Sequence, residues 1–239
     1  MFLGHAAVGL ASKAVAPRLS LGTLVAAAFF LDLLWPIFLL LGWESVRIDP
    51  GNTAITPLDF TDYPISHSLV AVVLWAVLCS AVYHVVARFA ATRLGAARIP
   101  GVAVASGVPA REWTGAVVVG LAVASHWFLD LLTHRPDLPL IPGGAARVGL
   151  GLWNSVPGTL LAEGGLFGIG AWIYWRRTRP RSRAGSWGLA SLLSALVLIY
   201  IANVAGPPPP GPGAIAAAGL LLWALPPWAA WVDRHRTGS

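Results

Sequence analysis

Apolar residues run through most of the chain in stretches long enough to cross a lipid bilayer, which takes about 20 residues of helix. Polar or Gly/Pro-rich stretches separate these runs at 42–66, 90–112, 134–153 and 176–186, as is typical of loops. The pattern predicts an all-α, polytopic transmembrane helical bundle of about six or seven membrane segments, at 2–16, 20–41, 67–89, 113–133, 155–175, 187–205 and 213–231. The first segment is short and contains glycine, so a tilted or re-entrant helix is the alternative there.

Composition agrees with this interpretation. Hydrophobic residues make up 56% of the chain and charged residues 11%, whereas soluble domains are about 25% charged. The segments and their connections use up the 239 residues, so we expect a single integral membrane domain over 1–239. Cys79 is the single cysteine, which excludes disulfides within one chain and thiolate metal sites.

The basic residues predict how the chain is oriented. Of the 16 Lys and Arg residues, only Arg47, Arg135 and Arg147 fall on one side of the predicted membrane. Because cytoplasmic loops carry the excess of Lys and Arg, loops 42–66 and 134–153 should face outward, with the N-terminus outside and the C-terminus cytoplasmic. The net charge of +6 therefore reflects topology and contact with membrane lipids. We expect no nucleic-acid partner.

Ionisable residues inside the apolar runs are the strongest functional signal. Burying such a group in a bilayer costs at least about 2.5 kcal/mol, so it marks a candidate site. Asp32, His126, Asp130 and Glu163 lie within predicted spans, and His5 and His67 lie at the starts of two others. At about 1.5 Å of rise per residue, all of them reach a similar depth in the outer leaflet.

The residue types at this depth suit a metal ion. The His126-x-x-x-Asp130 spacing places an imidazole and a carboxylate on one face of a helix. Imidazole and carboxylate ligands fit zinc, manganese or iron(II). Each residue also has a structural alternative, such as a contact between helices or a helix cap. We predict a divalent metal site with the ligands His5, Asp32, His67, His126 and Asp130.

Four short motifs lie within residues 1–135: Gly4-His5, Asp32, Ile65-Ser66-His67-Ser68 and His126-x-x-x-Asp130. In this the chain resembles bacterial inner-membrane metal-dependent hydrolases, which are distantly similar to the superfamily of zinc-dependent phospholipase C and the single-strand nucleases. The resemblance implies an all-helical protein of the bacterial cytoplasmic membrane that uses these residues, with zinc, in phosphoester hydrolysis. Asp62 stands where the family often has a histidine, and a second His-x-x-x-Glu step is absent, so one or two metal ions are expected instead of three.

These observations predict a membrane-embedded metal-dependent hydrolase that cleaves phosphoester or other ester bonds in lipid-type substrates at the extracytoplasmic side. Glu163 or Asp62 would serve as general base. The alternative is a non-enzymatic membrane protein, either an ion or proton pathway or a structural factor, that uses the same His/Asp cluster.

Overall fold

The computed structural model describes residues 1–96 and 108–238, and most of them are helical. The α-helices are α1 (Phe2–Ala11), α2 (Leu21–Ala28), α3 (Phe30–Leu40), α4 (Pro64–His67), α5 (Leu69–Ala96), α6 (Val108–Thr133), α7 (Val156–Arg177), α8 (Arg183–Ala205), α9 (Pro212–Leu221) and α10 (Leu225–Arg234). Short 3-10 helices cover Ser12–Ala14, Leu152–Asn154 and Leu222–Ala224. Helices α5 and α6 extend into the predicted loop 90–112, and the rest of that loop lies outside the described residues.

The chain is a helical membrane protein. Within the described residues, five helical stretches are long and apolar enough to span a membrane: Leu69–Ala90, Trp113–Thr133, Val156–Arg177, Arg183–Ala205 and Pro212–Arg234. A sixth is counted if α2 and α3, which meet at a bend of 55°, form one broken span.

The first predicted segment, 2–16, is not among these spans. It forms α1, which has 10 residues, followed by a 3-10 turn. Ten residues of helix reach only about 15 Å, half the thickness of a bilayer core. Helix α1 instead lies inside the bundle and packs on α2, α6 and α7.

The prediction of an all-α chain omitted the short strands. Within the described residues, six of them form three two-stranded antiparallel sheets. The pairs are β1 (Ser45–Ile48) with β2 (Leu58–Asp62), β3 (Leu138–Pro139) with β4 (Arg147–Val148), and β5 (Thr178–Pro180) with β6 (Arg236–Gly238). Strands β1 to β4 lie in two predicted loops, so they change those loops and leave the bundle intact.

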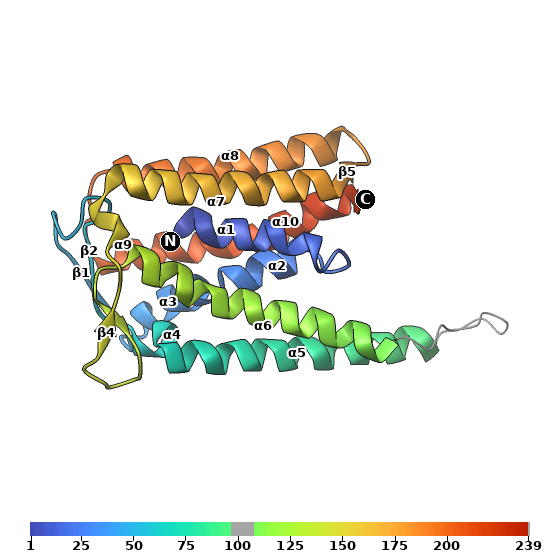
Figure 1. Cartoon of the computed structure of the whole chain (residues 1–239), viewed down its shortest axis with the longest axis horizontal. Helices are drawn as coiled ribbons and strands as arrows, with labels where there is room; N and C mark the ends of the chain where they lie inside the picture. Colours follow the sequence, from blue (N-terminus) through green and yellow to red (C-terminus); the bar gives the residue numbers. More distant parts are fainter. Residues whose placement is uncertain (97–107, 239) are drawn as a thin grey trace.

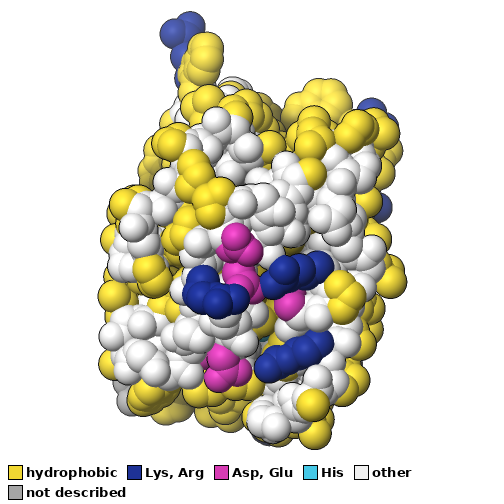
Figure 2. Space-filling model, turned by 90° about the vertical axis from the view of Figure 1, so that its left-hand side faces the viewer, with side chains coloured by type: hydrophobic (Ala, Val, Ile, Leu, Met, Phe, Trp, Pro, Cys, Tyr) yellow, Lys and Arg dark blue, Asp and Glu magenta, His cyan; other side chains and the backbone are white. Residues whose placement is uncertain are grey.

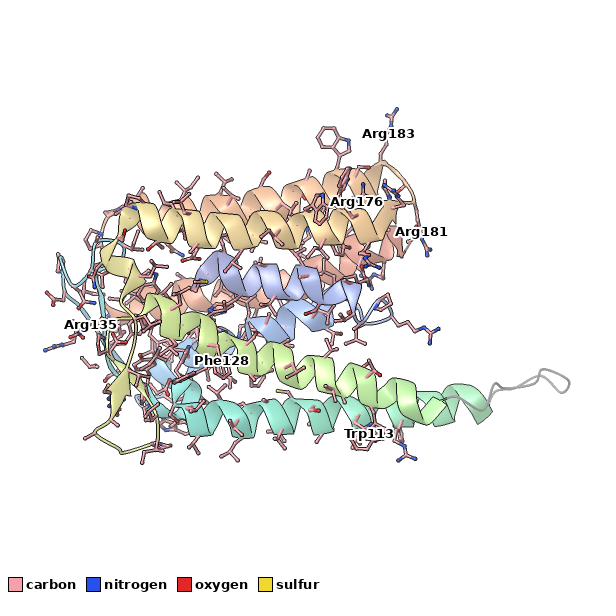
Figure 3. All side chains as sticks on the ribbon, viewed as in Figure 1. Trp113, Phe128, Arg135, Arg176, Arg181 and Arg183 are labelled. Atoms are coloured by element: carbon pink, nitrogen blue, oxygen red, sulfur yellow. The ribbon has the colours of Figure 1, made fainter. Side chains whose placement is uncertain are left out.

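The helices form a long bundle with distinct ends (Figure 1). Helices α7 and α8 lie along one side and α5 and α6 along the other, with α1, α2, α3, α9 and α10 between them. We refer to the end that carries β1 to β4 as the hairpin end and the end near Arg176, Arg181 and Arg183 as the arginine end (Figure 3). Arg135 lies at the hairpin end (Figure 3).

Charges are balanced locally at the hairpin end, where basic and acidic side chains lie side by side (Figure 2). Asp59 accepts hydrogen bonds from Arg47 at 2.5 Å and also from Arg135. These pairs join the β1–β2 hairpin to the segment that follows α6. The hairpin end therefore forms an ordered cover over the ends of the helices.

The arginine end has a buried polar network of its own. Lys13 Nζ donates to Asp233 Oδ2 at 2.6 Å and to the Leu19 carbonyl at 2.7 Å. Asp233 also accepts from the Tyr174 hydroxyl at 2.9 Å. This network ties the turn after α1 to α7 and α10.

Candidate metal centre

The structure brings five predicted ligands together from four helices. His5 comes from α1, Asp32 from α3, His67 from α4, and His126 and Asp130 from α6. One ligand atom from each of His5, Asp32 and His126 lies within 4.8 Å of the others, and the same holds for His67, His126 and Asp130. His126 belongs to both groups, so the two groups describe one centre.

His126 is held in a single orientation by the backbone. Its Nδ1 lies 2.9 Å from the carbonyl oxygen of Ala28, the last residue of α2, and can only donate to it. In the neutral imidazole this leaves Nε2 with a lone pair. Nε2 lies 3.2 Å from Asp130 Oδ2 and 3.6 Å from Asp32 Oδ1, yet it has no hydrogen-bond partner in the described part of the chain. That is the arrangement of a metal-ligating histidine, in which the second nitrogen is fixed by a donor bond.

His67 is oriented by a relay from the β1–β2 region. The Ser66 hydroxyl lies 2.6 Å from Glu44 Oε2 and donates to it, so the Ser66 oxygen accepts from Nδ1 of His67, also at 2.6 Å. Nε2 of His67 then carries the lone pair and lies 3.8 Å from Asp130 Oδ2 and 3.9 Å from Asp32 Oδ1. The relay therefore prepares His67 for the same role as His126.

Glu44 is the anchor of this relay and was not predicted as a site residue. It accepts further bonds from the backbone nitrogens of Ile65 at 2.8 Å and Ser66 at 2.7 Å. Burial raises the pKa of the Glu44 carboxyl, against the effect of these hydrogen bonds. In the sequence Glu44 is one of several acids in a polar loop, and the only hint of its role is the serine beside His67.

His5 completes the cluster by stacking. Its ring lies parallel to that of His126, with centroids 3.5 Å apart and planes 8° apart. Nε2 of His5 lies 3.1 Å from Asp130 Oδ1, and its Nδ1 has no hydrogen-bond partner among the described residues. Asp130 Oδ1 also accepts a hydrogen bond from the N-terminal ammonium of Met1 at 2.5 Å, and the two groups form a buried ion pair.

Asp32 is the cluster residue that faces open space. Its side chain is 26% exposed, whereas that of His67 is 7% exposed and that of His126 is fully buried. A cavity of about 380 Å³ begins here, and Asp32, His67 and Asp130 form part of its wall. A molecule in the cavity would therefore meet the cluster on the side of Asp32.

The two predicted general bases lie in different surroundings. Glu163 is buried, lines the same cavity, and accepts a hydrogen bond from the backbone nitrogen of Leu3 at 2.7 Å. It thus also anchors the start of α1. Asp62 is not brought to the cluster: its side chain is 58% exposed, lies 3.8 Å from Arg147 and does not line the cavity.

A second histidine–carboxylate pair lies at the cavity wall. Nδ1 of His134 lies 2.9 Å from Asp137 Oδ1, which also accepts from the Tyr63 hydroxyl at 3.0 Å. The rings of His134 and Trp153 lie 4.3 Å apart, and both residues line the cavity. Asp137 was not singled out in the sequence because it follows Pro136 in a loop, where a solvated carboxylate is the default.

The donor set fits a divalent cation. Two carboxylates with neutral imidazoles carry a charge of about −2, of which the N-terminal ammonium of Met1 offsets about one, and the net negative charge that is left favours a cation. Of the two carboxylates, Asp130 is buried and paired with the Met1 ammonium, whereas Asp32 is partly exposed at the cavity and remains available to a bound cation. His126 and His67 each have Nδ1 occupied, and both direct Nε2 toward Asp32 and Asp130, as a shared metal site requires.

Removing the Ser66 hydroxyl tests the relay. We expect Ser66→Ala to weaken metal affinity by about 10- to 100-fold, the usual effect of losing a hydrogen bond to a ligating histidine, while the fold persists. Titration of chelator-stripped protein with zinc would measure this. Ser68→Ala is the matched control, because the Ser68 hydroxyl accepts from the Ala71 nitrogen and does not contact an imidazole. Equal affinities in the two variants would contradict the relay.

We compared the chain with protein-family models, with curated proteins and with solved structures, and none of them matches it.

Proposed function

We propose that this protein is a membrane-embedded, metal-dependent hydrolase that cleaves phosphoester or other ester bonds in lipid-type substrates. One observation carries the proposal: His126 and His67 have Nδ1 committed to hydrogen bonds and present Nε2 to Asp32 and Asp130 at the end of a cavity. Zinc suits this donor set best, with manganese and iron(II) as alternatives.

A bound dication would supply a water of lowered pKa as nucleophile and would stabilise the charge that develops on a substrate oxygen. The chain's own residues provide the rest. Asp32 borders the cavity, where it orients the reacting group. Glu163 lines the same cavity, where its carboxylate, held by the backbone nitrogens of Leu3 and Gly4, would accept a proton from the attacking water.

A conduit for ions or protons is the less favoured alternative. The hairpin end has the His/Asp cluster, and the arginine end has the network around Lys13 and Asp233. Between them along α1, however, lie Ala6, Ala7 and Leu10, which are buried and apolar. A proton pathway needs a chain of polar groups or water through this layer.

A purely structural role is disfavoured by the unpaired atoms. Polar residues that hold membrane helices together satisfy one another's hydrogen bonds. Here Nε2 of His126 and Nδ1 of His5 are buried and have no hydrogen-bond partner among the described residues. His84 shows that one such atom is tolerated, but two of them in one polar cluster are costly unless a ligand or an ordered water uses them.

The proposed location is the bacterial cytoplasmic membrane, with the hairpin end outward. Arg176, Arg181 and Arg183 gather at the opposite end from Arg135 (Figure 3), as the positive-inside rule requires for that orientation. The cluster would then act on lipid-type substrates at the extracytoplasmic side.

The test is hydrolysis of a panel of phospholipids and lipid phosphates by purified protein, with release of phosphate or head group as the measurement. Asp130→Asn should lose activity to background and remain monodisperse in detergent, because an amide keeps the shape but is a poor ligand without charge. Asp62→Asn is the matched control and should remain active, since Asp62 lies away from the cavity. Undiminished hydrolysis by Asp130→Asn, or wild-type protein that is metal-free and inactive on the whole panel, would refute the proposal.

A further inference from the structure

The cavity extends from the cluster toward α8 and α9, and its wall there is apolar apart from Tyr200 and Asn203 of α8. Ile199 and Val204 of α8 line it on one side, and Ala214, Ile215 and Ala218 of α9 on the other, with Leu222 following. These apolar side chains offer no hydrogen bond to a polar ligand, and Asn203 is the polar exception on this side. The cavity is therefore amphipathic, with a charged end at Asp32 and an apolar end between two helices.

Helices α8 and α9 are consecutive but pack on different partners. Helix α8 packs on α10 and α1, whereas α9 packs on α3. Their surroundings are lipid-facing, because Leu198 and Ile201 of α8 and Leu221 of α9 are exposed along the same stretch. The apolar end of the cavity thus lies where two membrane helices diverge beside the bilayer.

Two buried hydrogen-bond donors belong to residues that line the cavity. Trp35 Nε1 and the Tyr200 hydroxyl are buried and have no hydrogen-bond partner in the described part of the chain. Both residues line the cavity. Buried donors of this kind are rare in native proteins unless a ligand or water satisfies them. Because these two atoms are inaccessible, Asp32, His67 and Asp130 supply the polar wall that the head group of a ligand would meet.

We infer that the space between α8 and α9 is a binding site for the hydrocarbon chain of a membrane lipid, which enters sideways from the bilayer while its head group meets Asp32 and the rest of the cluster. The assignment rests on the proposed function, because that function places the lipid's reacting group at the cluster. A lipid hydrocarbon chain that moves from the bilayer into this site gains no hydrophobic free energy, since both environments are apolar. The site therefore selects lipids by how well the length and shape of their hydrocarbon chain fit the cavity.

Photo-crosslinking tests this site without any need for turnover. The probe is phosphatidylglycerol with a diazirine near the end of one acyl chain, in vesicles that hold the purified full-length protein, and labelled residues are mapped by mass spectrometry. We expect labelling at Ile215 and Leu222, in addition to the bulk-lipid labelling of exposed residues such as Leu221.

Ala218→Trp should fill the site and reduce labelling at Ile215 and Leu222 by about tenfold, with Leu221 unchanged, because overpacking a cavity costs enough to displace a chain. Ala217→Trp is the matched control: Ala217 is the preceding residue of α9, is exposed and does not line the cavity. If Ala218→Trp does not fold, Ala218→Leu should give a smaller reduction at the same two residues.

Absence of labelling at Ile215 and Leu222 in wild type, or equal labelling in the Ala217 and Ala218 variants, would overturn the inference. The outcome is separable from that of the proposed function. If wild-type protein is labelled as expected but hydrolyses no lipid, the binding site for the lipid chain is supported and the proposed hydrolase function is refuted. Protein that hydrolyses lipid but does not label here would refute the chain site alone.

Discussion

His126→Ala is expected to reduce bound metal from about one ion per chain to background, since a site that loses its central ligand loses most of its binding free energy. His126 is the one residue shared by both groups of candidate ligands, and its Nε2 is aimed at Asp32 and Asp130. Elemental analysis of protein purified without chelator would measure the metal content. Activity on any substrate found in the panel should fall with it.

His84→Ala is the matched control for this experiment. His84 also has a buried Nδ1 without a partner in the described structure, but it stacks on Trp113 with ring centroids 4.3 Å apart and belongs to neither group of ligands. It should keep its metal. Full metal retention in His126→Ala would show that the cluster is not a metal centre.

Gly170→Val is expected to disrupt the metal centre from a distance. A Cβ atom at Gly170 of α7 would lie 2.6 Å from the carbonyl oxygen of Ala7 and 2.7 Å from its Cα. Backbone atoms cannot yield as a flexible side chain would, so α1 must move away from α7, and His5 moves with it. Overpacking of this kind costs about 1–3 kcal/mol. Both the melting temperature in detergent and the zinc affinity should fall.

Gly168→Val controls for the intrinsic cost of valine in a helix. Gly168 lies on the same helix, and a Cβ there would meet nothing within 4 Å. This variant should resemble wild type in both measurements. If the two variants behave alike, the close contact between α1 and α7 does not support the centre.

The sequence was informative about the cluster because of two simple physical constraints. A charged group in an apolar run needs a partner, which singled out Asp32 and Asp130. Helical spacing then placed His126 on the same face as Asp130, and a constant rise per residue put His5 and His67 at a similar depth. These arguments need no knowledge of how the helices pack, and the structure does bring these five residues together.

Other parts of the site depend on packing and could not be predicted in this way. Glu44 reaches Ser66 only because the chain between them folds back through β1 and β2. Tyr200 reads as an ordinary interfacial tyrosine until the cavity beside it is known. Asp62 was chosen from its place in a motif, and its exposed position beside Arg147 follows from the register of the hairpins.

The number and the ends of the membrane spans could also be predicted only in part from the sequence. Helix α1 is apolar enough to suggest a crossing, but hydropathy does not distinguish a helix surrounded by lipid from one surrounded by other helices. The break between α2 and α3 lies within a continuous apolar run, so the predicted segment 20–41 was treated as one helix.

The Ala28 carbonyl lies at this break, where it accepts the hydrogen bond that orients His126. Phe29, with φ of −94° and ψ of 6°, interrupts the helix, and such an interruption inside a membrane is tolerated only where protein shields it. The shield is α6, whose His126 donates to Ala28. One hydrogen bond therefore serves two purposes: the Nδ1–H of His126 shields the Ala28 carbonyl beside the break, and the same bond directs Nε2 toward Asp32 and Asp130.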